Sequence, residues 1–518
     1  MGRAEHVAKN LQFTMLSELI LAGLKFISRR VFVLYMGKEY LGLNGLFTDI
    51  LSLLSLAELG FGVSITYSLY RPVAQGDKEI IKSLMRLYRR VYWSISAVVL
   101  AAGLCLLPFL NFFIREMPED IPYIPLIYVL NVINVSFSYL FSYKATLLFV
   151  HQKKYIDSAL RAICTLFAVT AQIAVLVRTG NYLYYLCISI VSTLVQNKIV
   201  SVKTEKLYPY LKEKTVCPLP EEILKDIRKN VSAMILHRIG SVAVFGTDNL
   251  LISKFVGIGI TGLYSNYIMI RNFLTALINT LFNAITPAMG NLNVTESAEE
   301  KRQAFHRLNF FSAWLFGWIS ICLIWLYDPF ITIWLGEDYL LPRTVVFLIV
   351  ANFYINSMRI PVANTKSVMG LFWDERYKSI LEAVMNLVVS VILARRWGIT
   401  GILSGTLVST LTLPFWIEPL GLYRYGLKQK VRVYFVQYLS CLSLTVAAGA
   451  VTGLLCRFAE CLCRTAKSGS LDFLLKLILC MLVPHVIYLL AWHRRPEYHF
   501  LRELAGRMAK RTLPFLHE

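Results

Sequence analysis

The chain has 518 residues, of which 56% are hydrophobic and 16% are charged, and its mean hydropathy is +0.57. This composition excludes an ordinary soluble globular protein and is typical of a polytopic membrane protein. The formal net charge of +21 would indicate nucleic-acid binding in a soluble protein, but the distribution of the charge along this chain argues against such a partner.

About 14 apolar stretches follow one another along the chain, and most are long enough to cross a bilayer. The sequence therefore predicts an all-α polytopic membrane protein with about 14 transmembrane helices. The expected spans cover residues 10–36, 41–70, 84–114, 121–150, 155–178, 181–206, 229–256, 260–290, 308–335, 342–370, 377–397, 399–420, 431–456 and 471–492.

The basic residues outside these spans lie mostly on one side of the membrane. With a cytoplasmic N-terminus, about 32 of the 53 Lys and Arg residues fall in cytoplasmic segments, about 9 lie on the other side and about 12 lie within spans. We therefore expect both termini in the cytoplasm. Most of the positive charge then sets the topology and faces anionic lipid headgroups.

An internal repeat divides the chain. Gly37-x4-Gly42-Leu43 aligns with Gly257-x4-Gly262-Leu263, 220 residues further on, and a second pair of matching segments has nearly the same separation. Repeats of this kind are typical of transporters. We expect two pseudo-symmetric six-helix lobes over residues 1–207 and 229–420, a cytoplasmic linker over 208–228, two more helices within 421–493 and a basic cytoplasmic tail over 494–518.

Basic residues within the spans are costly unless they face a bundle interior or a wet cavity. In the first span, Lys25 and Arg29 share one helical face, and Arg30 follows. Such residues either line a cavity for an anion or form structural ion pairs. The candidate substrate-binding cations are Lys25, Arg29, Arg30, Lys144, Arg238, Arg271, Arg359 and Lys366.

Polar residues form stripes on two later spans, where they would hold uncharged groups of a substrate or hydrogen-bond between helices. The candidates are Asn272, Asn279, Asn283, Asn352 and Asn356. Buried carboxylates and one histidine are candidates for proton or cation coupling, with a fixed ion pair as the alternative. These are Glu18, Asp49, Glu58, His237 and Asp248.

Two stretches carry a family resemblance. Residues Tyr40–Gly62, YLGLNGLFTDILSLLSLAELGFG, and Gly246–Gly257, GTDNLLISKFVG, closely resemble the helix 2 and helix 7 signatures of Wzx-type bacterial polysaccharide flippases. The resemblance implies the fold of the multidrug/oligosaccharidyl-lipid/polysaccharide (MOP) exporter superfamily, which includes MATE transporters, with two lobes around a cationic cavity. Carried over by position, it points to Lys25, Arg29, Glu58, His237, Arg238, Asp248 and Arg271.

The resemblance also implies a function, namely movement of undecaprenyl-diphosphate-linked oligosaccharide across the bacterial plasma membrane by alternating access. Gly37, Gly42, Gly60, Gly62, Gly257 and Gly262 are candidate pivots, with close helix packing as the alternative. We expect a monomer that contacts membrane lipids and polysaccharide polymerase machinery, without cofactor or metal. The alternatives are a cation-coupled multidrug extruder and a membrane-embedded glycan polymerase or ligase, although the sequence has no catalytic signature and no long outward loop.

Overall fold

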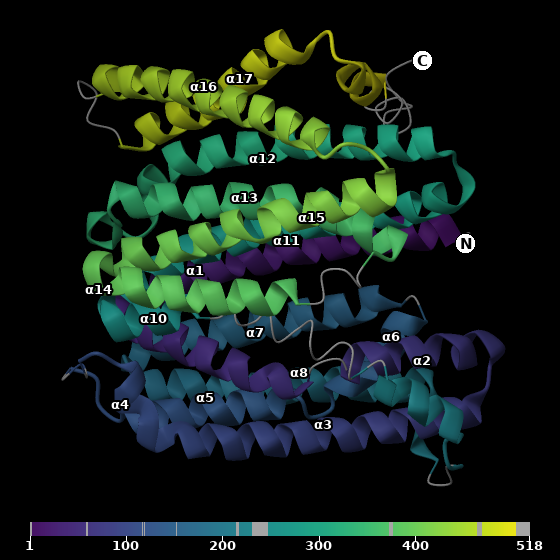
Figure 1. Cartoon of the computed structure of the whole chain (residues 1–518). Coiled ribbons are helices and arrows are strands. Elements are labelled where there is room, and N and C mark those ends of the chain that lie inside the picture. The colour runs from purple at the N-terminus through teal and green to yellow at the C-terminus, as the bar shows by residue number, and fades with distance from the viewer. Residues whose placement is uncertain are drawn as a thin grey trace, which may run out of the picture. The chain divides into compact units, whose positions relative to one another are not determined.

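The computed structural model describes residues 3–58, 61–116, 118, 120–151, 153–213, 217–229, 231, 247–371, 377–463 and 469–503. Across these ranges the regular secondary structure is helical, without a strand, which confirms the predicted all-α class. The chain separates into two compact units, Met1–Phe273 and Leu274–Glu518. Figure 1 shows long helices that run roughly parallel within each unit.

Within the described ranges, nine helical segments are long and apolar enough to cross a membrane, so the chain is a multi-pass membrane protein. The sequence predicts about 14 spans, so the nine segments do not correspond one to one to the predicted spans. Lys378–Leu427 joins two predicted spans in one segment, with a positive φ of 53° at Gly398. The first predicted span is not among the nine.

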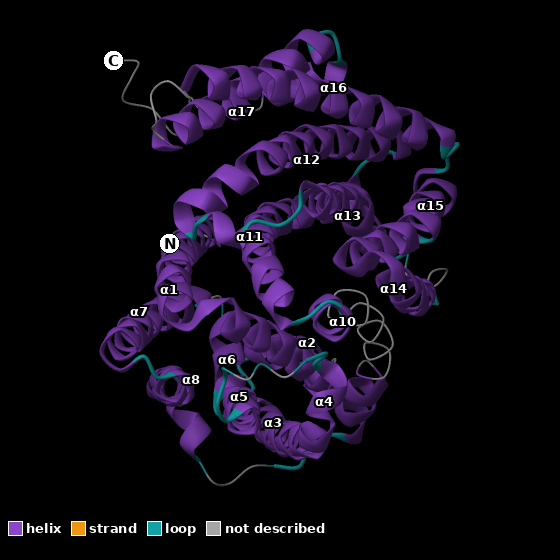
Figure 2. Cartoon of the chain, turned by 90° about the vertical axis from the view of Figure 1, so that its left-hand side faces the viewer, coloured by secondary structure: helices purple, strands orange, loops and turns teal. Residues whose placement is uncertain are grey.

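The first unit is a bundle of helices that ends partway along α11. The bounds are α1 (Arg3–Leu54), α2 (Phe61–Gln75), α3 (Lys78–Leu106), α4 (Leu110–Phe113), α5 (Ile124–Ser138), α6 (Ala145–Val150), α7 (Lys154–Thr179), α8 (Tyr182–Leu207), α10 (Asp248–Phe255) and α11 (Ile258–Thr295), and residues 221–229 are also helical. Helix α7 packs between α1 and α8, and α5 packs between α3 and α8; Figure 2 shows α3 beside α5.

The two copies of the glycine motif contact each other reciprocally inside the first unit. A Cβ added at Gly42 would overlap the carbonyl oxygen of Ile258, and one added at Gly262 would overlap that of Lys38. Residues 38 and 42 of the first copy correspond to residues 258 and 262 of the second. Each copy therefore places its second glycine against the same backbone carbonyl position of the other copy. Each copy begins at a glycine with positive φ, 79° at Gly37 and 133° at Gly257, a backbone region that favours glycine.

These glycines therefore serve two purposes. Gly37 and Gly257 allow the chain to turn between helices, whereas Gly42 and Gly262 permit close packing, as does Gly62, whose added Cβ would lie 2.9 Å from Tyr92 Oη. Gly60 lies outside the described residues.

The described part of the predicted linker packs on the first unit. Tyr208 and Ile227 belong to a hydrophobic cluster with residues of α2, α3 and α6. Ser83 Oγ donates to the Cys217 carbonyl at 2.6 Å, and Ser64 Oγ donates to the Ile227 carbonyl at 3.3 Å. The segment is thus held against helices α2 and α3 by both apolar and polar contacts.

The second unit is built from long helices α12 (Ala298–Trp334), α13 (Arg343–Met369), α14 (Lys378–Thr412), α16 (Arg432–Cys463) and α17 (Gly469–Trp492), together with the short α15 (Pro414–Gly421). Helix α12 begins with a capping box between Ser297 and Glu300, which satisfies backbone donors at the helix start. It packs against α13, α16 and α17. Helices α16 and α17, the two C-terminal helices that the sequence predicts, lie side by side (Figure 1).

Candidate functional site

Arg29 lies within the first unit, on α1, beside an aromatic wall. Its Nη1 donates to Ser265 Oγ of α11 at 3.3 Å. Phe32, one turn along α1, contacts Tyr182 and Tyr185 of α8 with ring centroids 5.6 and 5.4 Å away. Among the side chains that the structure describes, no carboxylate forms an ion pair with Arg29. A guanidinium at this depth without a carboxylate is suited to an anionic ligand.

The neighbouring cations of α1 are more accessible than Arg29. The side chains of Lys25 and Arg30 are exposed, whereas Arg29 is half-buried. Lys25 precedes Arg29 by one helical turn on the same face, as the sequence predicts. The side chain of Glu18 and all of His237 and Arg238 lie outside the description.

A polar cluster on α1, α10 and α11 contains two of the predicted coupling carboxylates. Tyr264 Oη donates to Asp248 Oδ2 at 3.1 Å. Asp49 interacts electrostatically with Asp248 and with Arg271, and Asn249 lies beside it. Arg271 Nη2 also donates to Asn272 Oδ1 at 3.3 Å. Asp49, Asp248 and Arg271 are among the residues predicted from the sequence, whereas Tyr264 and Asn249, which lack charge, are not.

Two further candidates have local partners. Glu58 accepts a hydrogen bond from Tyr92 Oη, which in turn receives one from Tyr88 Oη at 3.3 Å. Lys144 forms an ion pair with Glu205 and donates to Ser201 Oγ at 2.9 Å. Among the described residues, these hydrogen bonds and ion pairs of Glu58 and Lys144 do not involve Arg29, so the structure does not bring all the predicted charges together.

Helix α11 carries the asparagine stripe on an exposed face. The side chains of Asn272, Asn279 and Asn283 are exposed, whereas Ile278 and Phe282 are buried. The polar face of this helix is therefore not consumed by packing. Its asparagine amides can donate to and accept from the hydroxyl groups of a ligand.

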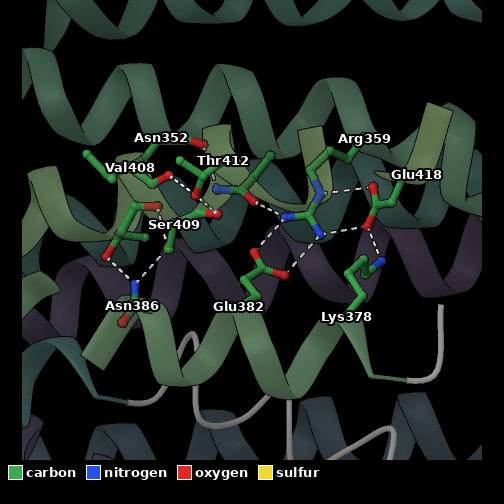
Figure 3. A network of polar contacts seen from close by, with 11 residues as sticks. Asn352, Arg359, Lys378, Glu382, Asn386, Val408, Ser409, Thr412 and Glu418 are labelled. Atoms are coloured by element: carbon green, nitrogen blue, oxygen red, sulfur yellow. Dashed lines mark hydrogen bonds and ion pairs between the residues drawn. The ribbon is translucent and has the colours of Figure 1, made fainter. Parts of the chain in front are cut away.

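The cations of α13 have a different environment. Arg359 Nε and Nη2 donate to the two carboxylate oxygens of Glu418 at 3.0 and 2.7 Å, and Nη1 donates to Glu382 at 3.1 Å (Figure 3). Lys378 also forms an ion pair with Glu418. Two cations and two carboxylates thus meet between α13, α14 and α15, with the Glu382 and Glu418 side chains only 4% and 5% exposed.

The other polar residues of α13 are also engaged. Asn352 Nδ2 donates to the Leu403 carbonyl at 3.0 Å, and Asn356 accepts from Arg359 at 2.9 Å. Lys366 is buried near the end of the helix. Glu382, Glu418 and Lys378 are not among the residues predicted from the sequence. The two glutamates lie within the predicted spans 377–397 and 399–420, so a charge inside a span is the signal that could have identified them.

Comparison with known proteins finds one family whose sequence pattern this chain matches. Residues 7–293 match the family described as "Polysaccharide biosynthesis protein", which is more than half of the chain. No curated protein matches the chain in sequence.

Solved structures share the fold. The lipid II flippase MurJ in an inward closed conformation matches with a TM-score of 0.63 and 13% identity over 93% of this chain and 98% of that chain. A mutant of the Vibrio cholerae MATE transporter VcmN matches with a TM-score of 0.59 and 12% identity over 82% and 98%. An inward-facing multidrug resistance MATE family transporter of the MOP superfamily matches with a TM-score of 0.56 and 14% identity over 81% and 99%. The chain therefore has the fold of MurJ and the MATE transporters.

Proposed function

Since the chain belongs to the polysaccharide biosynthesis protein family, whose fold here is that of flippases and transporters and not of enzymes, we propose that it flips a lipid-linked oligosaccharide. The substrate is an undecaprenyl-diphosphate-linked repeat unit for a capsule, exopolysaccharide or O-antigen. It crosses the bacterial plasma membrane by alternating access.

The observation that carries this proposal is the environment of Arg29. Arg29 is half-buried and forms no ion pair with a described carboxylate, and a cation in such surroundings within a membrane protein is unfavourable unless an anion reaches it. The guanidinium fork can bind a diphosphate through two parallel hydrogen bonds. The exposed Lys25 and Arg30 add positive charge near the same helical turns.

The remaining predicted residues take supporting roles in this proposal. Asn272, Asn279 and Asn283 offer amides to the sugar hydroxyls from the exposed face of α11. Asp49 and Asp248 are the candidates for coupling to a proton or cation, because their mutual repulsion depends on how many of them are ionised. Glu58, Lys144, Arg359 and Lys366 stay predictions as substrate or coupling residues.

Orientation and partners follow from the same proposal. The loop charges favour cytoplasmic termini. The prenyl tail stays in the lipid, and polysaccharide polymerase machinery receives the flipped repeat unit. We propose a monomeric transporter that needs no metal or cofactor.

The test is to delete the gene and locate the lipid-linked repeat unit. Accumulation on the cytoplasmic face supports the proposal, whereas normal delivery to the outer face contradicts it. Re-expression of the Arg29→Ala variant at normal levels should fail to restore delivery, and a matched Phe109→Ala variant, which alters an exposed residue of the first unit, should restore it. Efflux of cationic dyes would indicate a multidrug extruder instead, and glycan polymerisation by the purified protein alone would refute transport as its sole activity.

A further inference from the structure

A second basic site lies in the first unit, at the end where the linker packs. A cavity of about 440 Å³ is lined by residues from the start of α3, the 3-10 turn Ser142–Lys144, the end of α8 and the turn Pro209–Lys212. Its volume falls in the range of ordinary ligand sites. Five cations line it: Lys82, Arg86, Arg89, Lys144 and Lys212.

Three of these cations form one stripe of α3. Lys82, Arg86 and Arg89 are spaced at i, i+4 and i+7, so their side chains leave the same helical face. Their surroundings differ: the Lys82 side chain is 4% exposed and pairs with Glu79 and Glu213, whereas Arg86 and Arg89 are exposed. A stripe with one anchored lysine and two accessible guanidinium groups faces the cavity.

The carboxylates of the cavity do not balance its cations. Among the described residues, Glu205 and Glu213 are the only acidic side chains that line it alongside the five basic ones. Glu205 pairs with Lys144, and Glu213 pairs with Lys82. With five basic and two acidic side chains, the lining has a net positive charge.

The position of the cavity along α3 suits a phosphate group at the membrane surface. The helical segment Lys78–Phe113 has 36 residues, about 54 Å of helix, whereas the hydrocarbon core is about 30 Å thick. Lys82 to Arg89 occupy the first turns, and the apolar run follows Arg90. These cations consequently lie at headgroup level, on the side that the loop charges assign to the cytoplasm.

We propose that this cavity binds a phosphate-bearing anion, from an anionic phospholipid headgroup or from soluble phosphate. Arg86 and Arg89 bind the phosphate oxygens, and Lys212 closes the site from the linker side. The bound anion then joins α3 to the linker, adding to the Lys82–Glu213 ion pair and the Ser83–Cys217 hydrogen bond. The proposal does not depend on Arg29 or α11, which carry the transport proposal, although Lys144, one of the candidate substrate-binding cations, also lines this cavity.

The experiment uses the purified full-length protein in a neutral detergent. Binding of dihexanoylphosphatidylglycerol, inorganic phosphate and zwitterionic dihexanoylphosphatidylcholine is measured by calorimetric titration. Since each Lys or Arg near such a surface contributes about 1 kcal/mol, the Arg86→Gln/Arg89→Gln variant should bind the anion about 30-fold more weakly. The matched control Lys203→Gln/Lys206→Gln removes two exposed cations of α8 that do not line the cavity and should change affinity less than about threefold.

The pattern across ligands separates the two sources. Saturable phosphatidylglycerol binding that is lost in the cavity variant, without competition by inorganic phosphate, identifies a lipid headgroup. Saturable phosphate binding lost in the same variant identifies soluble phosphate. Absence of saturable binding by either anion, equal weakening in the control, or equal affinity for phosphatidylcholine overturns the proposal. If the double variant does not fold, Lys212→Gln, in an exposed position on the linker turn, replaces it with a smaller expected loss.

Discussion

Arg29 in the first unit and Arg359 in the second are both basic residues inside predicted spans, yet they have opposite surroundings. Arg29 has a serine hydroxyl and nearby aromatic rings, whereas Arg359 donates to two buried glutamates. Those glutamates lie 23 and 59 residues further along the chain. The position of a basic residue within a predicted span therefore does not reveal whether carboxylates neutralise it, as they do Arg359.

The largest expected effect on this contrast comes from removing a carboxylate from the second unit. Glu418→Gln leaves Arg359 and Lys378 without their shared anion, and breaking a buried ion pair costs about 3–5 kcal/mol. We expect a large fall in the unfolding temperature of the purified protein. Glu460→Gln, which alters the more exposed partner of Lys476, is the control and should cost less than about 1 kcal/mol. Equal stability of the two variants would contradict the structural role of the network.

Removal of the Arg29 cation from the first unit should affect transport and not folding. Arg29→Gln removes no ion pair with a described side chain, so the unfolding temperature should stay near that of the wild type. A lost charge-assisted hydrogen bond is worth about 1.5–3 kcal/mol, so flipping of a labelled lipid-linked oligosaccharide in proteoliposomes should slow about tenfold to a hundredfold. Transport at the wild-type rate would contradict the proposed role of Arg29 in substrate binding.

A third test addresses the close helix packing at Gly42, which lies on the same helix as Arg29. Gly42→Ala places a methyl group on the carbonyl oxygen of Ile258, and overpacking of this kind costs about 1–3 kcal/mol. In Gly45→Ala the nearest atoms lie 3.8 Å from the added carbon, so this control should be neutral or slightly stabilising. Thermal unfolding of both variants measures the difference, and a Gly42→Ala protein as stable as the control would disprove the close contact.

The smallest expected effect concerns pH and lies outside the spans. His151 stacks on Tyr208 with ring centroids 4.5 Å apart, and burial, aided by Lys153, lowers the pKa of its imidazole. The unfolded chain therefore binds a proton more readily, so stability should fall as the pH drops below about 6.5. His151→Phe should flatten the pH dependence of the unfolding temperature between pH 5 and pH 7, roughly the range in which histidine titrates. A profile identical to the wild type would show that His151 does not titrate differentially.

The sequence predicts the features that depend on hydropathy and local spacing. The all-α membrane class and the placement of the asparagines on one face of α11 belong to this class. It does not predict partners that distant helices supply. The tyrosine that donates to Glu58, the glutamate beside Lys144 and the glutamates around Arg359 all come from other segments. Only the tertiary structure therefore shows whether a carboxylate from another segment neutralises a buried cation.

The reciprocal contact between the two glycine motifs has a consequence for the origin and assembly of the chain. Contacts in which residue i meets j and j meets i are those of a two-fold homodimer. A gene fusion of two identical subunits would preserve such a contact without needing the covalent connection between them. Two polypeptides divided within residues 214–216 and made in the same cell should consequently still bring Gly42 and Gly262 together.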